Sequence, residues 1–340
     1  MPSKDAGHTY PISAKLSDNE SACKELLGHS TDATFRRFSI AINENRGAID
    51  CLLIFISSLS DEKMIAQAIL EPLSSQFAPF RTLTANDVRQ KIHSKNIREV
   101  SELQEAVLSV LRGNSLLLMN GCKTAFLINT QKSYHRSIDE PQSEIAVKGP
   151  RSGFVENLLI NIALLRQRLP HPALQLEEVT IGTYSRTKTV IAYIKDIAQP
   201  EIVAKVKSRL LAIDIDSIDY SGQIEQFIED HPSTIFPTIG NTQKPDKVSA
   251  LLMEGRVAIL TDGTPVALYV PHLFFEAIQS SEDYSSRPFY TSIIRMLRFI
   301  GLLLSVMAPS FYFAALNYHK EMIPTALVSP LINAREKVPI

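Results

Sequence analysis

Short apolar runs and helical patterns alternate along the first half of the chain. The apolar runs predict four strands, at residues 35–42, 48–56, 115–119 and 123–128. Ser60 is a typical N-cap and starts one predicted helix, whereas Gly113 follows the end of another. Asn120-Gly121 separates the last two strands and is typical of a two-residue hairpin turn. We therefore expect residues 35–135 to form an α/β lobe.

The same order of elements returns in the second half. Its predicted strands are at 177–184, 187–194, 256–260 and 266–270, its helices at 154–169, 200–211, 221–229 and 247–254, and a long loop at 230–246. Gly255 and Gly263 stand 142 positions after Gly113 and Gly121, so the helix stop and the hairpin turn both recur. This order predicts an internal duplication. We therefore predict an α/β fold of two similar lobes, the second at residues 154–272.

More polar segments flank and join the lobes. We expect a flexible N-terminal arm at 1–34 with one short helix at 18–27, an interlobe linker at 136–153, and an amphipathic juxtamembrane segment at 273–298. The arm contains no apolar run, so it does not resemble a signal peptide, and we expect both lobes to lie in the cytosol.

One stretch near the C-terminus differs from the globular pattern. Residues 299–318 contain no charged side chain, and a helix of this length rises about 30 Å, enough to cross the hydrocarbon core of a bilayer. Arg295 and Arg298 flank its N-terminal side, and Pro309 is expected to kink it. We predict a transmembrane helix coupled to the lobes through these three residues. The alternative is a helix buried in a protein core. Residues 319–340 are expected to start a truncated membrane domain.

Composition excludes several classes of partner and site. The formal net charge is −1, from 35 basic and 36 acidic side chains, so no nucleic-acid partner is expected. Three cysteines, Cys23, Cys51 and Cys122, lack the spacing of a zinc site or a disulfide framework, and we interpret them as small apolar side chains. Phosphate-binding loops, hydrolase motifs and metal-ligand clusters are absent from the sequence. We therefore predict no catalytic residue, no metal, no cofactor and no enzymatic activity.

The interlobe linker is the polar segment whose side chains are the best candidates for binding a ligand. Glu140, Gln142, Glu144, Lys148 and Arg151 offer charges of both signs beside glycines that permit close backbone approach. A zwitterionic ligand such as an amino acid would suit this combination. The alternative is a solvated hinge whose charges bond one another, and the sequence alone favours that alternative because exposed hinges are usually polar.

Several long segments then resemble a known family. EPQSEIAVKGPRSGF (140–154) resembles the EPQTE and VRGP-R-x-GF motifs of the GerA family of spore germination proteins. NTQKPDKVSALLMEGRVAILTDGTPVALYVP (241–271) and HKEMIPTAL (319–327) continue the resemblance in order and spacing. Lys148 departs from it, because the family motif has arginine there. The resemblance covers residue 45 to the end of the chain.

The resemblance implies a nutrient receptor. The A subunits of the GerA family combine two cytosolic α/β lobes with membrane helices. They act with B and C subunits in the spore inner membrane, where the receptor is expected to sense amino acids or sugars and to release ions. It implies, as partners of this chain, B and C subunits, further A subunits, membrane lipid and a small germinant. The alternative is a non-sensing scaffold like the stage V sporulation protein AF. A single spanning run could not enclose a pore alone.

Overall fold

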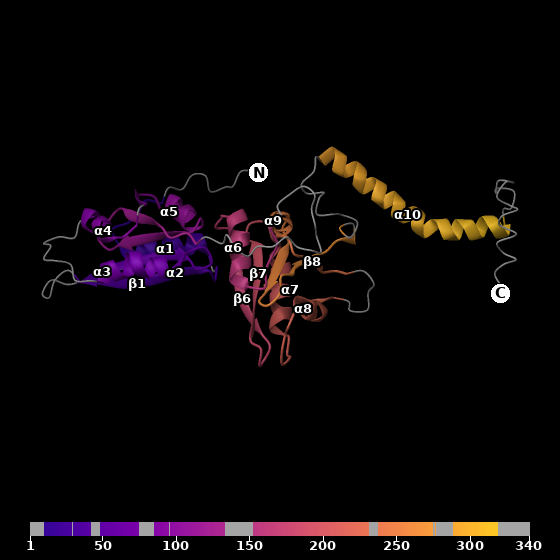
Figure 1. Ribbon diagram of the computed structural model, residues 1–340, viewed down its shortest axis with the longest axis horizontal. Coiled ribbons are helices and arrows are strands. Elements are labelled where there is room, and N and C mark those ends of the chain that lie inside the picture. The colour runs from indigo at the N-terminus through magenta and orange to yellow at the C-terminus, as the bar shows by residue number, and fades with distance from the viewer. Residues whose placement is uncertain are drawn as a thin grey trace. The chain divides into compact units, whose positions relative to one another are not determined.

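The computed structural model describes residues 10–28, 30–41, 48–74, 85–94, 96–132, 152–230, 237–274, 276 and 288–318. The described chain belongs to two units (Figure 1). Residues up to 272 form the first, which contains two lobes, and the long helix that starts at residue 288 belongs to the second. We call the first unit the two-lobed body.

The first lobe is a five-stranded antiparallel sheet with helices on both faces. The strand order is β1-β2-β4-β5-β3, with β1 at Ala33–Ala41, β2 at Ala48–Ile56, β3 at Ile97–Val100, β4 at Asn114–Met119 and β5 at Ala125–Asn129. The helices are α1 at Leu16–Leu27, α2 at Glu62–Ile65, the π-helical turn η1 at Ala66–Leu70, α3 at Glu71–Ser74, α4 at Ala85–Lys91 and α5 at Leu103–Val110. Because both faces are covered, β2 and β4 are apolar at consecutive positions rather than at alternate ones.

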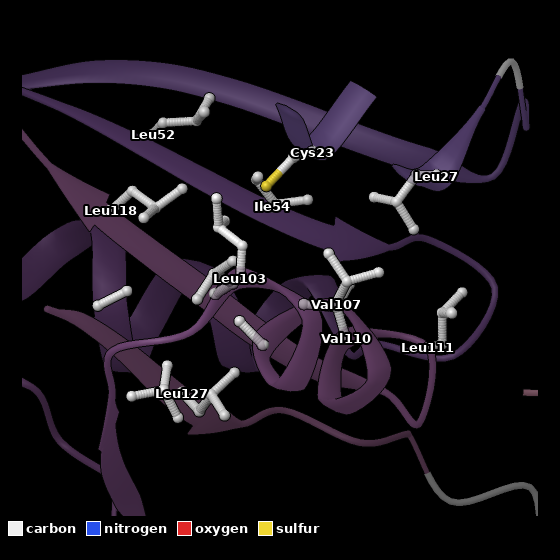
Figure 2. Packing of buried hydrophobic residues seen from close by; sticks show 14 of the residues in the cluster. Cys23, Leu27, Leu52, Ile54, Leu103, Val107, Val110, Leu111, Leu118 and Leu127 are labelled. Carbon is white, nitrogen blue, oxygen red and sulfur yellow. The ribbon is translucent and has the colours of Figure 1, made fainter. Parts of the chain in front are cut away.

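Alternation along these strands divides the core into two layers. Leu52, Ile54 and Leu118 belong to the same apolar cluster as buried residues of α1 and α5, and Figure 2 shows them in one layer with Cys23 of α1 and Val107 of α5. Their sequence neighbours point to the opposite face, where the second apolar cluster includes residues of η1, α3 and α4. The lobe is therefore a three-layer sandwich.

The second lobe repeats this topology. Its strand order is β6-β7-β9-β10-β8, with β6 at Leu174–Ile181, β7 at Thr187–Ile194, β8 at Gly240–Thr242, β9 at Val257–Thr261 and β10 at Ala267–Val270. Its helices are α6 at Leu158–Arg168, α7 at Pro200–Leu211, α8 at Ser221–Ile228 and α9 at Pro245–Met253. One apolar cluster lies with α6 and α9, and the other lies with α7 and α8. The prediction of two similar α/β lobes is confirmed.

The repeat extends to individual hydrogen bonds at the hairpin turns. In the first lobe, Asn120 Oδ1 accepts a hydrogen bond from the backbone N–H of Leu16 at 3.4 Å. In the second lobe, Asp262 Oδ1 accepts the equivalent bond from Leu158 at 3.1 Å. Each turn side chain therefore satisfies a free N–H at the start of a helix that lies about a hundred residues earlier.

A buried asparagine recurs in the first helix of each lobe. Asn19 of α1 accepts from the backbone N–H of Ser13 at 2.8 Å and donates to its carbonyl at 2.7 Å. Asn161 of α6 makes the same pair of bonds to Val155, at 2.8 and 2.6 Å. Both pairs fasten the chain that enters the helix, so α1 is the counterpart of α6.

The N-terminal segment differs from the expected flexible arm. Residues 10–28 are ordered, and Cys23 and Leu27 of α1 are buried in the first-lobe core with 0% and 2% exposure. The helix itself was expected, at 18–27, but its role was not. Its buried face carries Asn19 and Glu20, so its sequence does not have a continuous apolar stripe. The first lobe therefore starts before residue 35.

The long helix α10 occupies Pro288–Tyr318, and most of it is exposed and apolar. Its 26-residue stretch Phe289–Ala314 contains 18 consecutive residues with a mean hydropathy of 1.6, of which 6% are buried. Pro309 lies inside the helix, and Figure 1 shows α10 changing direction about midway along its length. By length and composition α10 can cross a membrane.

Candidate functional site

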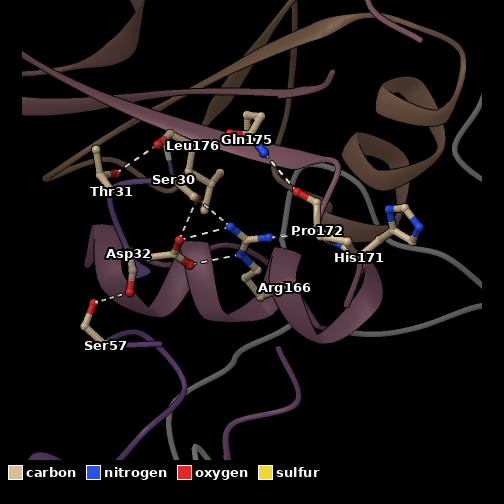
Figure 3. Close-up of polar contacts among 9 residues, drawn as sticks. All are labelled: Ser30, Thr31, Asp32, Ser57, Arg166, His171, Pro172, Gln175 and Leu176. Carbon is tan, nitrogen blue, oxygen red and sulfur yellow. Dashed lines mark hydrogen bonds and ion pairs between the residues drawn. The ribbon is translucent and has the colours of Figure 1, made fainter. Parts of the chain in front are cut away.

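The two lobes meet where the chain enters β1. The backbone N–H of Thr31 donates to the carbonyl of Leu176 at 2.9 Å, and the Thr31 hydroxyl donates to the same oxygen at 3.0 Å (Figure 3). Leu176 belongs to β6, an edge strand of the second sheet, whose outward carbonyls lack a strand partner on that side. The first lobe therefore bonds directly to the sheet edge of the second.

A buried ion pair lies beside this contact. Arg166 Nε donates to Asp32 Oδ2 at 2.9 Å, and Arg166 Nη2 donates to Asp32 Oδ1 at 3.0 Å. Ser30 bridges them, because its hydroxyl accepts from Arg166 Nη2 at 2.5 Å and donates to Asp32 Oδ1 at 2.7 Å. The two charged side chains are 1% and 2% exposed. The guanidinium and the carboxylate therefore satisfy each other in a bidentate geometry, away from water.

Backbone packing fits the lobes together around the ion pair. Gly28 ends α1 with a φ of +64°, and a Cβ atom there would lie 2.3 Å from Gln175 Oε1. Gln175 is 5% exposed and donates to the carbonyl of Pro172 at 2.9 Å, so it has little freedom to move away. Ala163 of α6 is fully buried within the first-lobe core cluster. The interface is therefore close-packed as well as ionic.

This interlobe joint, Ser30–Asp32 with Arg166 and Leu176, can hold the two lobes at a fixed angle. Separating it would leave a carboxylate and a guanidinium without their partners until water or a ligand replaced them. Breaking a buried ion pair by removing one partner typically costs about 3–5 kcal/mol. The joint is therefore sensitive to the loss of either charged partner while the lobes stay packed together.

The linker supplied the polar residues that the sequence singled out as ligand or interlobe contacts. Glu140, Gln142, Glu144, Lys148 and Arg151 lie outside the described residues and stay predictions. The end of the linker is described, and it is attached to the second lobe. Arg168 Nη2 donates to the hydroxyl of Ser152 at 2.6 Å, and the N–H of Phe154 donates to the carbonyl of Gln243 at 2.8 Å.

Sequence reasoning missed Asp32 and Arg166 for different reasons. Arg166 lies within the helical run LLINIALLRQR, beside the buried Leu165, and a charged residue next to the apolar stripe was a usable signal. Asp32 offered no comparable signal, because it follows Thr31 in a polar stretch that was interpreted as a loose arm. The pair is separated by 134 residues, so no local spacing relates its members.

A groove in the first lobe is a second candidate for binding. Its volume is about 520 Å³, within the range of small-molecule sites. It is lined by Lys15, Leu16, Ser17, Arg37, Phe38, Ser39, Asp50, Cys51 and Asn120. Arg37 also pairs with Glu20, and Asp50 accepts from Ser39 at 2.8 Å. The groove therefore presents charged side chains of both signs together with apolar ones.

The cysteines lie where apolar side chains are expected. Cys23 and Cys51 are fully buried, and burial raises the pKa of each thiol to about 12. Such thiols stay protonated at neutral pH and are poor nucleophiles. Among the residues that the structure describes, no three histidine, cysteine or carboxylate side chains lie together as a metal site would require.

The membrane-coupling residues predicted from the sequence all lie on α10. Arg295 and Arg298 are partly buried and lie in its first third, and Pro309 lies in its second half. A proline at this position leaves the carbonyl four residues earlier, that of Ser305, without its helical donor. The coupling role of these residues stays a prediction.

Comparison with known proteins identifies the family. The family model described as "Bacillus/Clostridium GerA spore germination protein" matches residues 21–340. Spore germination protein B1 of Bacillus subtilis (strain 168) is 36% identical over 96% of this chain and 67% of its own length. Spore germination protein KA of the same organism is also 36% identical, over 96% of this chain and 60% of its own length. The chain thus spans about two thirds or less of these relatives.

A solved structure supports the same assignment. The N-terminal domain of the A subunit of the Bacillus megaterium spore germinant receptor GerK3 is 29% identical, with a TM-score of 0.57. The match covers 79% of this chain and 99% of that domain. The matching family and structure are those of germination and receptor proteins rather than of a known class of enzyme. This chain therefore belongs to the GerA family of spore germination proteins.

Proposed function

We propose that this chain is the sensing and membrane-attached part of a germinant receptor A subunit. The observation that carries the proposal is the match to 99% of the N-terminal domain of the GerK3 A subunit, at 29% identity. The family membership and the apolar helix α10 support it as well. In this proposal the two-lobed body lies in the cytosol, and α10 crosses the spore inner membrane.

The interlobe joint shapes how the body responds to a signal. A ligand or partner shifts an equilibrium only by the difference in its affinity for the two states. A signal that opened the joint would have to bind the open arrangement of the lobes better than the closed one by at least the free-energy cost of parting Asp32 from Arg166. We therefore propose that moderate signals act on the body with the joint closed, and that the body transmits them to α10 as one piece.

The groove in the first lobe is our candidate for the nutrient site. A small zwitterion presents a carboxylate and an ammonium group, and the groove offers Arg37 and Lys15 for the first and Asp50 for the second. The linker residues remain a second candidate, on the sequence argument alone. In either case the bound molecule would be an amino acid or a compound of similar size and charge.

The proposed partners follow from the receptor assignment. We propose that the chain assembles with B and C subunits and with further A subunits, and that ion release depends on that whole assembly. The competing proposal is a scaffold that binds sister subunits and no nutrient, like the stage V sporulation protein AF. We assign no catalytic activity to the chain under either proposal.

Calorimetric titration of residues 10–274 with amino acids and sugars tests the proposal. Under the sensing proposal one nutrient binds, and Arg37→Gln weakens its binding at least tenfold. Arg36→Gln is the matched control, because Arg36 is the neighbouring exposed arginine of β1 and does not line the groove. If the nutrient binds equally well to both variants, its site does not lie in the groove. No binding of any nutrient would favour the scaffold.

A further inference from the structure

Another groove lies at a corner of the first lobe, beside the edge strand β3. Its volume is about 360 Å³, at the lower end of the range for small-molecule sites. We call it the asparagine groove, and it is lined by Asn96, Ile97, Arg98, Ser109, Asn114, Leu127 and Asn129. It shares no lining residue with the groove that contains Arg37, so the two are separate candidates.

Three asparagines come together across the sheet at this corner. Asn114 of β4 is paired in register with Asn129 of β5, and the N–H of Asn129 donates to the carbonyl of Asn96 at 3.3 Å. Side chains at paired positions of antiparallel strands point to the same face, with Cβ atoms about 4.5–5.5 Å apart. The side-chain amides of Asn114 and Asn129 are therefore close enough to contact one small molecule together.

Hydrogen bonds within the lobe determine what these two amides can offer. Asn129 Oδ1 accepts from the N–H of Gln131 at 3.1 Å, and Asn114 Nδ2 donates to the carbonyl of Ser109 at 3.1 Å. Within the part of the chain that the structure describes, this leaves Asn129 Nδ2 as a donor and Asn114 Oδ1 as an acceptor. A hydroxyl group both donates and accepts hydrogen bonds. The adjacent donor and acceptor therefore match two neighbouring hydroxyl groups.

The charges around the asparagine groove balance each other. Arg98 is the one charged residue among the described lining residues, and its guanidinium is paired with Glu105 of α5. The lining also contains the apolar side chains of Ile97 and Leu127, which can contact the C–H groups of a ligand. This combination suits an uncharged molecule that has both hydroxyl groups and C–H surface.

The second lobe has the same corner in a filled form. Gly240 and Tyr269 lie 142 positions after Arg98 and Leu127, and each pair is in register between an edge strand and its neighbour. Tyr269 is 2% exposed, and a Cβ atom on Gly240 would lie 2.2 Å from Tyr269 Cζ. The aromatic ring therefore occupies this corner of the second lobe. The repeated fold does not require an open corner, so the groove results from the particular side chains of the first lobe.

We propose that the asparagine groove binds an uncharged polyhydroxylated molecule of about the size of a monosaccharide. Asn129 donates to one hydroxyl group, Asn114 accepts from the neighbouring one, and Leu127 contacts the C–H groups. This inference goes beyond the proposed function, because the zwitterionic nutrient was assigned to the groove that contains Arg37. Failure of one site leaves the other standing.

Saturation-transfer NMR on the whole chain tests the site, in micelles of a detergent without a sugar headgroup. The uncharged probes are myo-inositol and glucose, and glucuronate is the charged comparison. We expect saturation transfer to both uncharged probes and weaker transfer to glucuronate. In a chain labelled with ¹⁵N at asparagine, the side-chain amide signals of Asn114 and Asn129 should shift as myo-inositol or glucose is added.

Two variants locate the bound molecule. Asn129→Leu keeps the approximate size of the side chain and removes its amide, so the affinity for myo-inositol or glucose should fall about tenfold. Arg98→Gly with Leu127→Tyr rebuilds the filled corner of the second lobe and should abolish binding. Asn241→Leu is the matched control, because Asn241 is an exposed asparagine of β8, the counterpart of β3.

Circular dichroism checks that each variant is folded. Leu127 is a core residue, so the double variant has the greater risk of unfolding, whereas Asn129 is exposed and Asn129→Leu alone is a sufficient test. No transfer to either uncharged probe would refute the proposal, and so would an unchanged affinity in Asn129→Leu. Tighter binding of glucuronate would refute the uncharged class of ligand. Binding of maltotriose without binding of glucose would show that the groove takes a glycan chain instead of a free small molecule.

Discussion

Removing one partner of the buried ion pair in the interlobe joint should strongly destabilise the two-lobed body. Arg166→Met keeps the length of the side chain and removes its charge, which leaves Asp32 buried with only the Ser30 hydroxyl as a polar partner from the joint. Because both charges are at most 2% exposed, we expect a loss of about 3–5 kcal/mol in the free energy of unfolding. Asp32→Asn should cost less, because the amide can still accept one bond from Arg166.

Removing both charges should restore much of the loss. The double variant Asp32→Leu with Arg166→Met has no orphaned charge, and replacing a buried pair by apolar side chains is often neutral or stabilising. A double-mutant cycle should therefore give a coupling energy of at least about 2 kcal/mol. Urea unfolding of residues 10–274, followed by circular dichroism, measures each corner of the cycle.

A surface pair gives the matched control. Lys188 and Glu178 lie 3.0 Å apart in the second lobe with side chains 61% and 36% exposed, so their cycle should give less than about 1 kcal/mol. Scanning calorimetry adds a second readout, because the single variant Arg166→Met should split one transition into two as the lobes uncouple. Single variants that cost no more than the surface control, with one transition retained, would refute the role of the joint.

Three further predictions concern single positions. Gly28→Ala should destabilise the body by about 1–3 kcal/mol more than Gly121→Ala, because both have positive φ but only Gly28 is packed against a neighbouring side chain; equal losses in urea unfolding would contradict the close packing. Cys23 should resist a thiol reagent at pH 8 while the partly exposed Cys122 reacts, because burial raises the pKa of Cys23 to about 12; equal rates for the two thiols would argue against the core position of α1. Hydrogen bonds from Lys24 and Arg37 lower the pKa of Glu20, so its stabilising effect is present above pH 4.5 and is lost as the pH falls through the lower folded pKa; Glu20→Gln should remove that part of the acid dependence, and an unchanged profile would contradict the assignment.

Local chemistry made much of the fold predictable. The hairpin turns at Asn120-Gly121 and Asp262-Gly263 were visible because positive φ and a short polar side chain select few residues. The central strands β2, β4 and β9 were visible because burial on both faces makes them continuously apolar. The repeat of these features predicts the two lobes from the sequence alone.

The missed elements lie at the edges of the sheets. β3 has the sequence IREV with Arg98 and Glu99 exposed, and β8 has only three residues, Gly240–Thr242, within a stretch that was expected to be a loop. These segments form strands because they pair with β5 and β10, and not because of their own side-chain pattern. The sequence did not reveal the interlobe joint for a related reason, because its residues come together only after the two sheets have formed.

The joint also delays completion of the first lobe during synthesis. Asp32 leaves the ribosome 134 residues before Arg166, and Ala163, which fills a place in the first-lobe core, emerges almost as late. At about 5–20 residues per second, the first lobe waits roughly 7–27 seconds with an uncompensated carboxylate and an unfilled core position. A nascent chain arrested before residue 163 should therefore be a preferred substrate for chaperones, and release past residue 176 should end that dependence.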